Sequence, residues 1–158
     1  VAYVLTGRDA EKPDRVCHST IGLSDHKLGQ DKGGVALGAE LVAACHEDCD
    51  YLDRALAVCA DLVLNHGLMC KPGVIVAGIL EGSDGTSQMK HMLFAIPSLW
   101  EDGLYPLSFK SKVVLWLQGI PVSDSEMAYA QQNGPGALGE KLVEAEADIL
   151  DLRREPAV

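Results

Sequence analysis

The 158-residue sequence lacks any apolar run that approaches the roughly 20 residues a helix needs to span a bilayer. It is poor in basic residues, with 13 Lys and Arg against 23 Asp and Glu, and its formal net charge is −10. An acidic chain repels phosphate backbones, which argues against nonspecific nucleic-acid binding. Its five cysteines are too few for a disulfide-built scaffold, and their odd number leaves a thiol unpaired in a monomer. We therefore expect a protein of the reducing cytoplasm that binds neither membrane nor nucleic acid.

Hydrophobic residues make up 47% of the sequence and charged residues 23%, which is typical of a globular protein and unlike a disordered chain. The length suits one domain with a single core, and no internal repeat or linker divides it. We expect one domain over residues 1–158. Because the sequence starts at Val1 and strand character begins at once, we also expect that an N-terminal segment is missing.

Several apolar stretches predict β-strands. They cover residues 1–6, 16–23, 35–44, 74–80, 91–96 and 112–122, and residues 149–152 suggest a further short strand. The periodicity of residues 35–44 also fits a helix, but Gly38 in the middle of the run favours a strand. Gly119 and Pro121 suggest a bulge or a strand end. The polar, glycine-bearing residues 24–34 and 81–90 predict loops.

Three segments have helical patterns. Residues 50–66 place Leu52, Leu56 and Cys59 on one apolar stripe, with Gly67 as the expected end. The first turn of this helix is expected to be capped by Asp48 or Asp50.

Ser123 and Glu126 have the spacing of a capping box, which predicts a second helix from Ser123 to about residue 132. Pro135 can begin a third helix, because the first helical position does not need an amide hydrogen. Its expected buried face consists of Leu138, Leu142 and Ala145. Strands that alternate irregularly with these helices predict an α+β fold, in which a mainly antiparallel, mixed sheet has its three helices packed on one side.

No catalytic or metal-binding template fits the sequence. Cys45, His46 and Cys49 lie close together, but the spacing is Cys-x3-Cys and no clean second pair faces it, so no metal site is expected. The glycine-bearing loops match neither a P-loop nor a dinucleotide-binding turn. The serines and cysteines stand in no nucleophile motif, so we expect no catalytic residue and no cofactor.

Two tryptophans have different expected roles. Trp116 lies within an apolar strand and is expected in the core, whereas Trp100 lies in a connection beside acidic residues. Because tryptophan is enriched at binding hot spots, Trp100 is a candidate partner contact, although half-buried structural tryptophans are commoner.

An ordered set of short motifs resembles the suppressor of fused family, and above all its single-domain bacterial members. The motifs cover nearly the whole chain in the order of the family. They are residues 21–25 (IGLSD), 39–42 (AELV) followed by the helix at 51–66, 90–94 (KHMLF), a run from Val113 through Glu126 to Leu142, and 149–154 (ILDLRR).

The resemblance implies a non-enzymatic protein-binding module of the same fold. Animal members of the family bind a short peptide of the Gli transcription factors as an added β-strand, and bacterial members include immunity proteins that neutralise toxins. The peptide-contact region of the animal proteins, carried over by position, falls around His18, Ser24 and Asp25, where Asp25 would offer an acceptor. Ser24 and Asp25 could equally start a turn, because both residue types bond to local backbone.

The expected function is therefore binding and inhibition of a protein or peptide partner, with an acidic surface that favours a basic one. Three alternatives remain at this point. The chain could regulate a transcription factor, it could be a hydrolase or thiol enzyme whose site forms only in three dimensions, or it could be a small metal-binding domain.

Overall fold

The computed structural model describes residues 1–30, 33–46, 51–82, 88–100 and 103–158. No helix in these ranges is long and apolar enough to cross a membrane. The elements in chain order are β1 (Tyr3–Arg8), β2 (Arg15–Ile21), the 3-10 turn η1 (Leu23–Asp25), β3 (Gly29–Gln30), β4 (Ala36–His46), α1 (Leu52–His66), β5 (Ile75–Val76), β6 (Met89–Ala95), β7 (Leu107–Ser108), β8 (Lys112–Ser123), α2 (Asp124–Asn133) and α3 (Pro135–Glu144).

One eight-stranded sheet runs through the molecule in the order β1-β2-β4-β8-β6-β5, with β3 paired to β4 and β7 paired to β8. The central pair β4–β8 is parallel, and the other six pairs are antiparallel. The predicted α+β class with a mainly antiparallel, mixed sheet is therefore confirmed. Residues 35–44, for which the periodicity allowed a helix, form a strand in the middle of this sheet.

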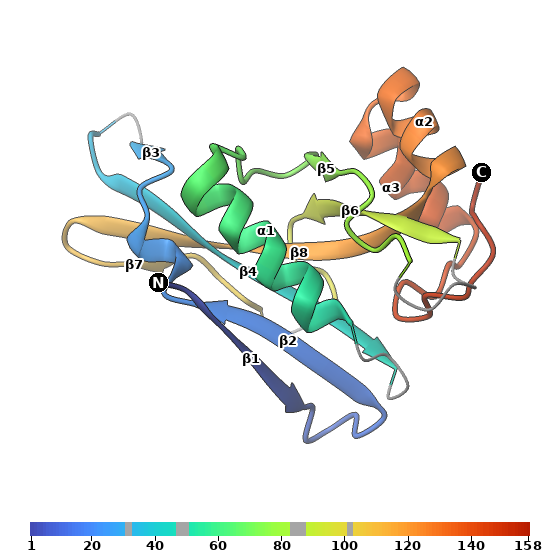
Figure 1. The fold of residues 1–158 in the computed structure, drawn as a ribbon, viewed down its shortest axis with the longest axis horizontal. Helices are drawn as coiled ribbons and strands as arrows, with labels where there is room; N and C mark the ends of the chain where they lie inside the picture. Colours follow the sequence, from blue (N-terminus) through green and yellow to red (C-terminus); the bar gives the residue numbers. More distant parts are fainter. Residues whose placement is uncertain (31–32, 47–50, 83–87, 101–102) are drawn as a thin grey trace.

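The helices cover both faces of the sheet, so the expectation that all three pack on one side is wrong. On β6, Met92 and Phe94 belong to the apolar cluster that includes α1, whereas Leu93 belongs to the cluster of α2 and α3. Successive strand residues point to opposite faces, so α1 lies on one face and α2 and α3 on the other. Figure 1 shows α1 lying across the sheet, with α2 and α3 near the C-terminus. The physical reason is that β6 is apolar at successive positions, so both of its faces must be covered.

The predicted ends of the helices are largely confirmed. Ser123 and Glu126 form the capping box of α2, and Gly67 ends α1 with a φ of 72°. The N-cap of α1 is Tyr51, which makes no side-chain cap, while Asp48 and Asp50 lie outside the described residues. Ala145 is exposed, contrary to expectation, because α3 ends at Glu144 and Ala145 is its C-cap.

Several predicted strands and loops differ from the structure. Only Ile75–Val76 of residues 74–80 is strand, because a turn begins at residue 77 and Gly78 adopts a φ of 70°. Residues 149–152 form turns instead of a strand. The predicted loop at 24–34 contains part of η1 and all of β3, and the loop at 81–90 ends where β6 begins, with residues 83–87 outside the described chain.

The predicted irregularity in β8 lies elsewhere. Gly119 and Pro121 pair regularly with Phe94 and Met92, and the register shifts between residues 89 and 91 of β6. Gly119 instead makes room for a neighbour, because a Cβ there would lie 2.6 Å from the Met92 sulfur. Trp116, expected in the core, is half-buried.

Candidate functional site

The two ends of the sheet are open edges within the described part of the chain. β1 is the longer edge strand, and it pairs on its inner side with β2. Tyr3 pairs with Ile21 and Leu5 pairs with Ser19, so these side chains lie on one face. Tyr3, Leu5 and Ile21 are 65%, 56% and 51% exposed. An edge strand with apolar side chains beside it is a surface on which another chain can add a strand.

A buried carboxylate fixes the turn that follows β2. Glu40 accepts hydrogen bonds from the Thr20 hydroxyl at 2.6 Å and from the backbone amides of Gly22 and Ser24 at 3.0 Å each. Gly38 allows the turn to lie directly on β4, because a Cβ at this position would come within 2.3 Å of the Ser24 carbonyl oxygen. The motifs at residues 21–25 and 39–42 are therefore joined in the structure by the hydrogen bonds that Glu40 accepts.

The predicted contact residues Ser24 and Asp25 lie together in η1 but differ in access. Ser24 is buried, and its carbonyl oxygen accepts a hydrogen bond from the Lys112 ammonium at 3.3 Å. The Asp25 side chain is 81% exposed and forms a 2.9 Å ion pair with Lys112. The hydrogen bond and the charge of Lys112 lower the pKa of Asp25, so it is ionised at neutral pH. Asp25 therefore presents a carboxylate that one lysine already contacts.

His18, a further predicted contact residue, is buried in β2. Its Nδ1 lies 2.9 Å from the Thr6 hydroxyl, and its Nε2 has no hydrogen-bond partner among the described residues. Burial lowers the pKa of His18, although the charge of Asp53 acts in the opposite direction. Because the imidazole is neutral and enclosed, it supports the β1–β2 pair and does not reach the surface.

Trp100, the last predicted contact residue, lies on the other face of the sheet. It is half-buried and hydrogen-bonds to the Cys17 side chain, which points away from that of its neighbour His18 along β2. Trp100 also lines an open pocket of about 430 Å³ with Arg15, whose guanidinium donates to the Leu99 carbonyl oxygen at 3.0 Å. The structure therefore brings Ser24 and Asp25 together and places His18 and Trp100 apart from each other.

The motif around His91 also has a structural role. His91 is buried, and its Nδ1 accepts a hydrogen bond from the Gly78 amide at 2.8 Å. The ring proton must therefore lie on Nε2, which faces an Asp124 oxygen at 2.9 Å. Asp124 also pairs with Lys90, and hydrogen bonds from these two side chains lower its pKa. This arrangement connects the turn after β5 to the start of α2.

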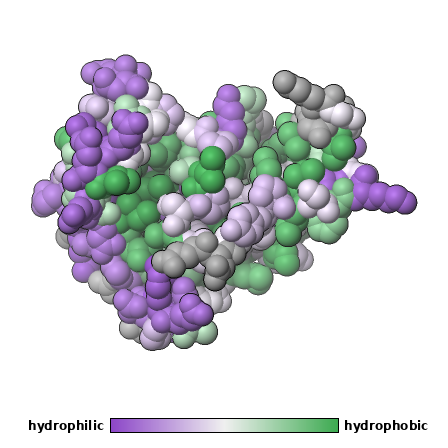
Figure 2. Space-filling model, turned by 180° about the vertical axis from the view of Figure 1, so that it is seen from behind, coloured by the Kyte–Doolittle hydropathy of each residue, from purple (hydrophilic) through white to green (hydrophobic). Residues whose placement is uncertain are grey.

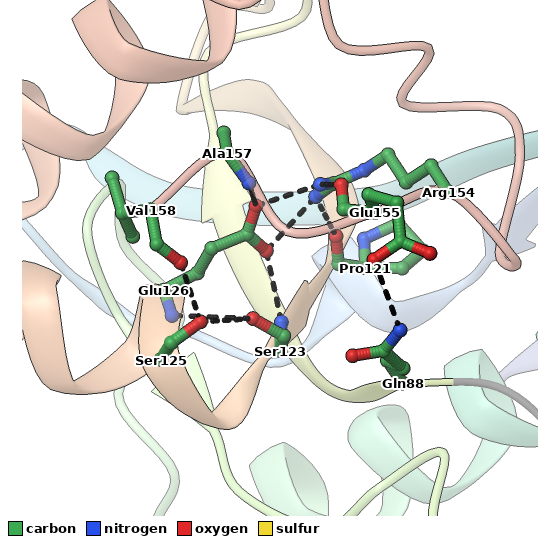
Figure 3. Close-up of polar contacts among 9 residues, drawn as sticks. All are labelled: Gln88, Pro121, Ser123, Ser125, Glu126, Arg154, Glu155, Ala157 and Val158. Carbon is green, nitrogen blue, oxygen red and sulfur yellow. Dashed lines mark hydrogen bonds and ion pairs between the residues drawn. The ribbon is translucent and has the colours of Figure 1, made fainter.

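The C-terminal motif is anchored by a buried ion pair (Figure 3). Arg154 donates through Nη1 and Nη2 to the two carboxylate oxygens of Glu126, at 2.6 and 2.9 Å. Glu126 also accepts from the backbone amides of Ser123 and Ala157, both at 2.9 Å. Burial alone would raise the pKa of Glu126, but these hydrogen bonds together lower it. The terminal segment is thus held at the first turn of α2.

The buried cysteines have poor properties for nucleophilic chemistry. Burial raises the pKa of Cys59 and of Cys70 to about 12, so both are protonated at neutral pH. Burial also raises the pKa of Cys17. No group of three or more metal-ligating side chains occurs in the described ranges, and Cys49 of the weighed Cys-x3-Cys pair lies outside them.

Two apolar grooves flank the sheet, and the sequence reasoning missed both. One lies at the C-terminal end of α1, between Val63, Met69 and Leu117. The other lies on the opposite face between α3 and the end of β6. The sequence did contain a signal for the second groove. Val143 follows Leu142 and falls outside the buried stripe of α3, so it predicts an apolar side chain exposed beside that helix.

Comparisons with known proteins agree on one family. The sequence model described as suppressor of fused protein (SUFU) matches residues 1–155. The immunity protein YqcF of Bacillus subtilis (strain 168) is 35% identical over 155 residues, which cover 98% of this chain and 81% of that protein.

Solved structures of the same family share the fold. A SUFU homologue from Neisseria gonorrhoeae FA 1090 superposes with a TM-score of 0.75 at 18% identity, over 98% of this chain and 77% of that one. A chain of the Sufu–Fu complex gives a TM-score of 0.66 at 14% identity, over 99% and 76%. Drosophila Suppressor of Fused gives 0.66 at 15% identity, and this chain spans 42% of its length.

Proposed function

This chain belongs to the suppressor of fused protein family, and on that premise we propose that it is a non-enzymatic, immunity-type module that inhibits a partner protein by binding it. The observation that carries the proposal is the 35% identity to immunity protein YqcF across 98% of the chain. The proposed site of action is the cytoplasm, where the partner would be held inactive.

The surface supports a binding role in two ways. Among the described strands, β1 pairs only with β2, and the exposed side chains of Tyr3 and Leu5 lie along this edge, which suits an added strand of a partner. The net charge of −10 favours a basic partner and would accelerate the encounter at low salt.

The four predicted contact residues divide into two groups in this proposal. Asp25 and Trp100 are accessible enough to touch the partner, Asp25 through its carboxylate and Trp100 through its ring. His18 and Ser24 are buried and act indirectly: His18 supports the β1–β2 pair, and Ser24 holds the η1 turn in place.

The test starts from the product of the gene beside this one, which the proposal expects to be a toxin. Cells that express that toxin alone should stop growing, and cells that also express this protein should grow. The purified proteins should co-elute as a complex, and titration calorimetry should give the affinity of the pair.

Matched variants locate the contact. Asp25→Asn should weaken the complex severalfold, whereas Asp14→Asn, which removes a carboxylate from an exposed turn residue, should leave the affinity unchanged. A purified sample that binds no neighbouring toxin but turns over a small molecule, with activity lost on changing one thiol or imidazole, would refute the proposal.

A further inference from the structure

The groove on the face opposite α1 is apolar and open. It has a volume of about 480 Å³ and lies where α3 and the segment after it pass over the end of β6 at Ala95 and over Ile120 of β8. Figure 2 shows this face, with an apolar, hollowed region bordered by hydrophilic residues. Val143, which lines the groove, is 78% exposed. The apolar lining consists of Ala95, Leu99, Ile120, Leu142, Val143, Ala147 and Ile149.

The segment that forms one side of this groove carries concentrated negative charge, and its Glu146 lines the groove itself. Residues 135–151 contain five acidic residues and a single lysine, which is a net charge of −4 of the −10 on the whole chain. Lys141 forms a 2.7 Å ion pair with Glu144, and Asp148 contacts His46 at the same distance. An apolar floor with an acidic border favours a partner that combines apolar and basic side chains.

Glu146 places one of these carboxylates at the groove in an unfavourable backbone conformation. Its φ is 49°, and it is the one non-glycine residue with positive φ in the described chain. The position follows the C-cap of α3, where glycine or asparagine is usually found. Retaining glutamate here costs stability, and residues held in such conformations cluster at functional sites.

The backbone around the groove indicates which conformation an occupant would take. Ala95 and Ile120 lie on β6 and β8, which pair with each other, and α3 satisfies its backbone internally. Among the described residues that line it, the groove therefore offers no sheet edge, and an extended segment would leave its own backbone groups unpaired on an apolar floor. A helix satisfies its backbone internally and can bury one apolar face.

We propose that this groove binds a basic amphipathic α-helix of the partner protein, with apolar side chains against Leu142 and Val143 and lysine or arginine side chains over Glu146. The identity of the partner as an inhibited protein rests on the proposed function, whereas the chemistry of the groove does not.

The first test uses a defined probe. A synthetic peptide of roughly 18 residues, with leucines on one helical face and lysines elsewhere, is titrated into the full chain and followed by fluorescence anisotropy. It should bind, and raising the salt from about 0.05 M to about 0.5 M should weaken binding severalfold. A scrambled peptide of the same composition, and one with glutamate for lysine, should bind at least tenfold more weakly.

Substitutions place the peptide in the groove. Val143→Ser should weaken binding about tenfold, as expected for loss of a buried valine's apolar contact. Val58→Ser is the matched control, because Val58 is a 47% exposed valine of α1 on the other face, and it should have no effect. Glu146→Gly should raise the melting temperature, because it removes the backbone strain, and should also weaken binding.

Each result decides between the proposals. Equal effects of Val143→Ser and Val58→Ser, or binding independent of salt and of peptide pattern, would overturn the groove assignment. Val143→Ser disrupting a dimer of this chain, measured by analytical ultracentrifugation, would also overturn it and make a second copy the occupant. A Val143→Ser variant that still neutralises the toxin would refute the groove alone, whereas failure of the unaltered protein to neutralise any toxin would refute the proposed function.

Discussion

Replacing Arg154 with methionine tests the account of the C-terminal anchor. Methionine keeps an unbranched apolar stem but lacks the guanidinium, so both hydrogen bonds to Glu126, at 2.6 and 2.9 Å, are lost. The hydrogen bonds to the Pro121 and Glu155 carbonyl oxygens, at 3.1 Å each, are lost as well. The Glu126 carboxylate would then stay buried with backbone donors but no cation. Breaking a buried pair on one side costs about 3–5 kcal/mol, which is a large fraction of the ~5–15 kcal/mol that holds a domain folded.

The pH dependence of this loss distinguishes the ion pair from simple packing. In the native protein the folded pKa of Glu126 is lowered, so its stabilising contribution is present above the unfolded pKa of about 4.3 and is lost as the pH falls through the folded value. In Arg154→Met, burial without the cation should raise the pKa of Glu126 above about 4.3. Protonation of Glu126 on acidification should then remove the unpaired buried charge and restore part of the variant's stability. The difference in stability between the two proteins should therefore be larger at pH 7 than at pH 4.

Urea unfolding at both pH values, followed by circular dichroism, measures this difference. Arg153→Met is the matched control, because Arg153 is the exposed neighbour, and it should change stability by less than about 0.5 kcal/mol. The double variant Glu126→Gln/Arg154→Met should recover part of the loss, because it removes the unpaired buried charge. The single amide oxygen of glutamine can still accept from one of the two backbone amides, Ser123 or Ala157. A loss in Arg154→Met below about 1 kcal/mol, or one identical at both pH values, would refute the reasoning.

Three further outcomes follow from the same contacts. Gly38→Ala should destabilise the fold by roughly 2–3 kcal/mol in urea unfolding, because its Cβ would come within 2.3 Å of the Ser24 carbonyl oxygen; a neutral effect would contradict the close approach. His18→Gln should remove a contribution to stability that depends on pH, because burial lowers the folded pKa of His18. This contribution is present above about pH 6.5 and is lost as the pH falls. Identical dependence of unfolding stability on pH in the two proteins would argue against this. Asp25→Asn should leave the melting temperature unchanged, because its ion pair with Lys112 is exposed, and a large shift would assign Asp25 a structural role.

Local sequence signals predicted those parts of the fold whose causes are local. The capping box of Ser123 and Glu126 and the helix end at Gly67 were read correctly, because each depends on residues a few positions apart. The apolar run at 74–80 was misread because turn geometry after Val76 overrides its β propensity. Helices on both faces could have been inferred from the apolar run at residues 92–95 of β6, because a strand that is covered on one face only would alternate apolar and polar residues.

The candidate site was less predictable, because its contacts join distant residues. The motifs that identify the family were found, but their roles were not: Glu40 holds the turn at Gly22, and Arg154 binds Glu126. No local pattern states that an acid and an arginine 28 positions apart will meet in the interior. The family resemblance thus identified residues that stabilise the fold, whereas the exposed groove beside Val143 could be found only from the structure.

The parallel pairing of β4 and β8 has a consequence for how the chain folds. It joins residues 36–42 to residues 112–118, so the centre of the sheet cannot form until most of the chain has left the ribosome. Contacts of such long sequence separation slow folding, because the intervening loop must close before the strands interact. During synthesis, the edge of β4 that pairs with β8 therefore stays unpaired until β8 has emerged. A chaperone that shields this edge should increase the yield of the native protein.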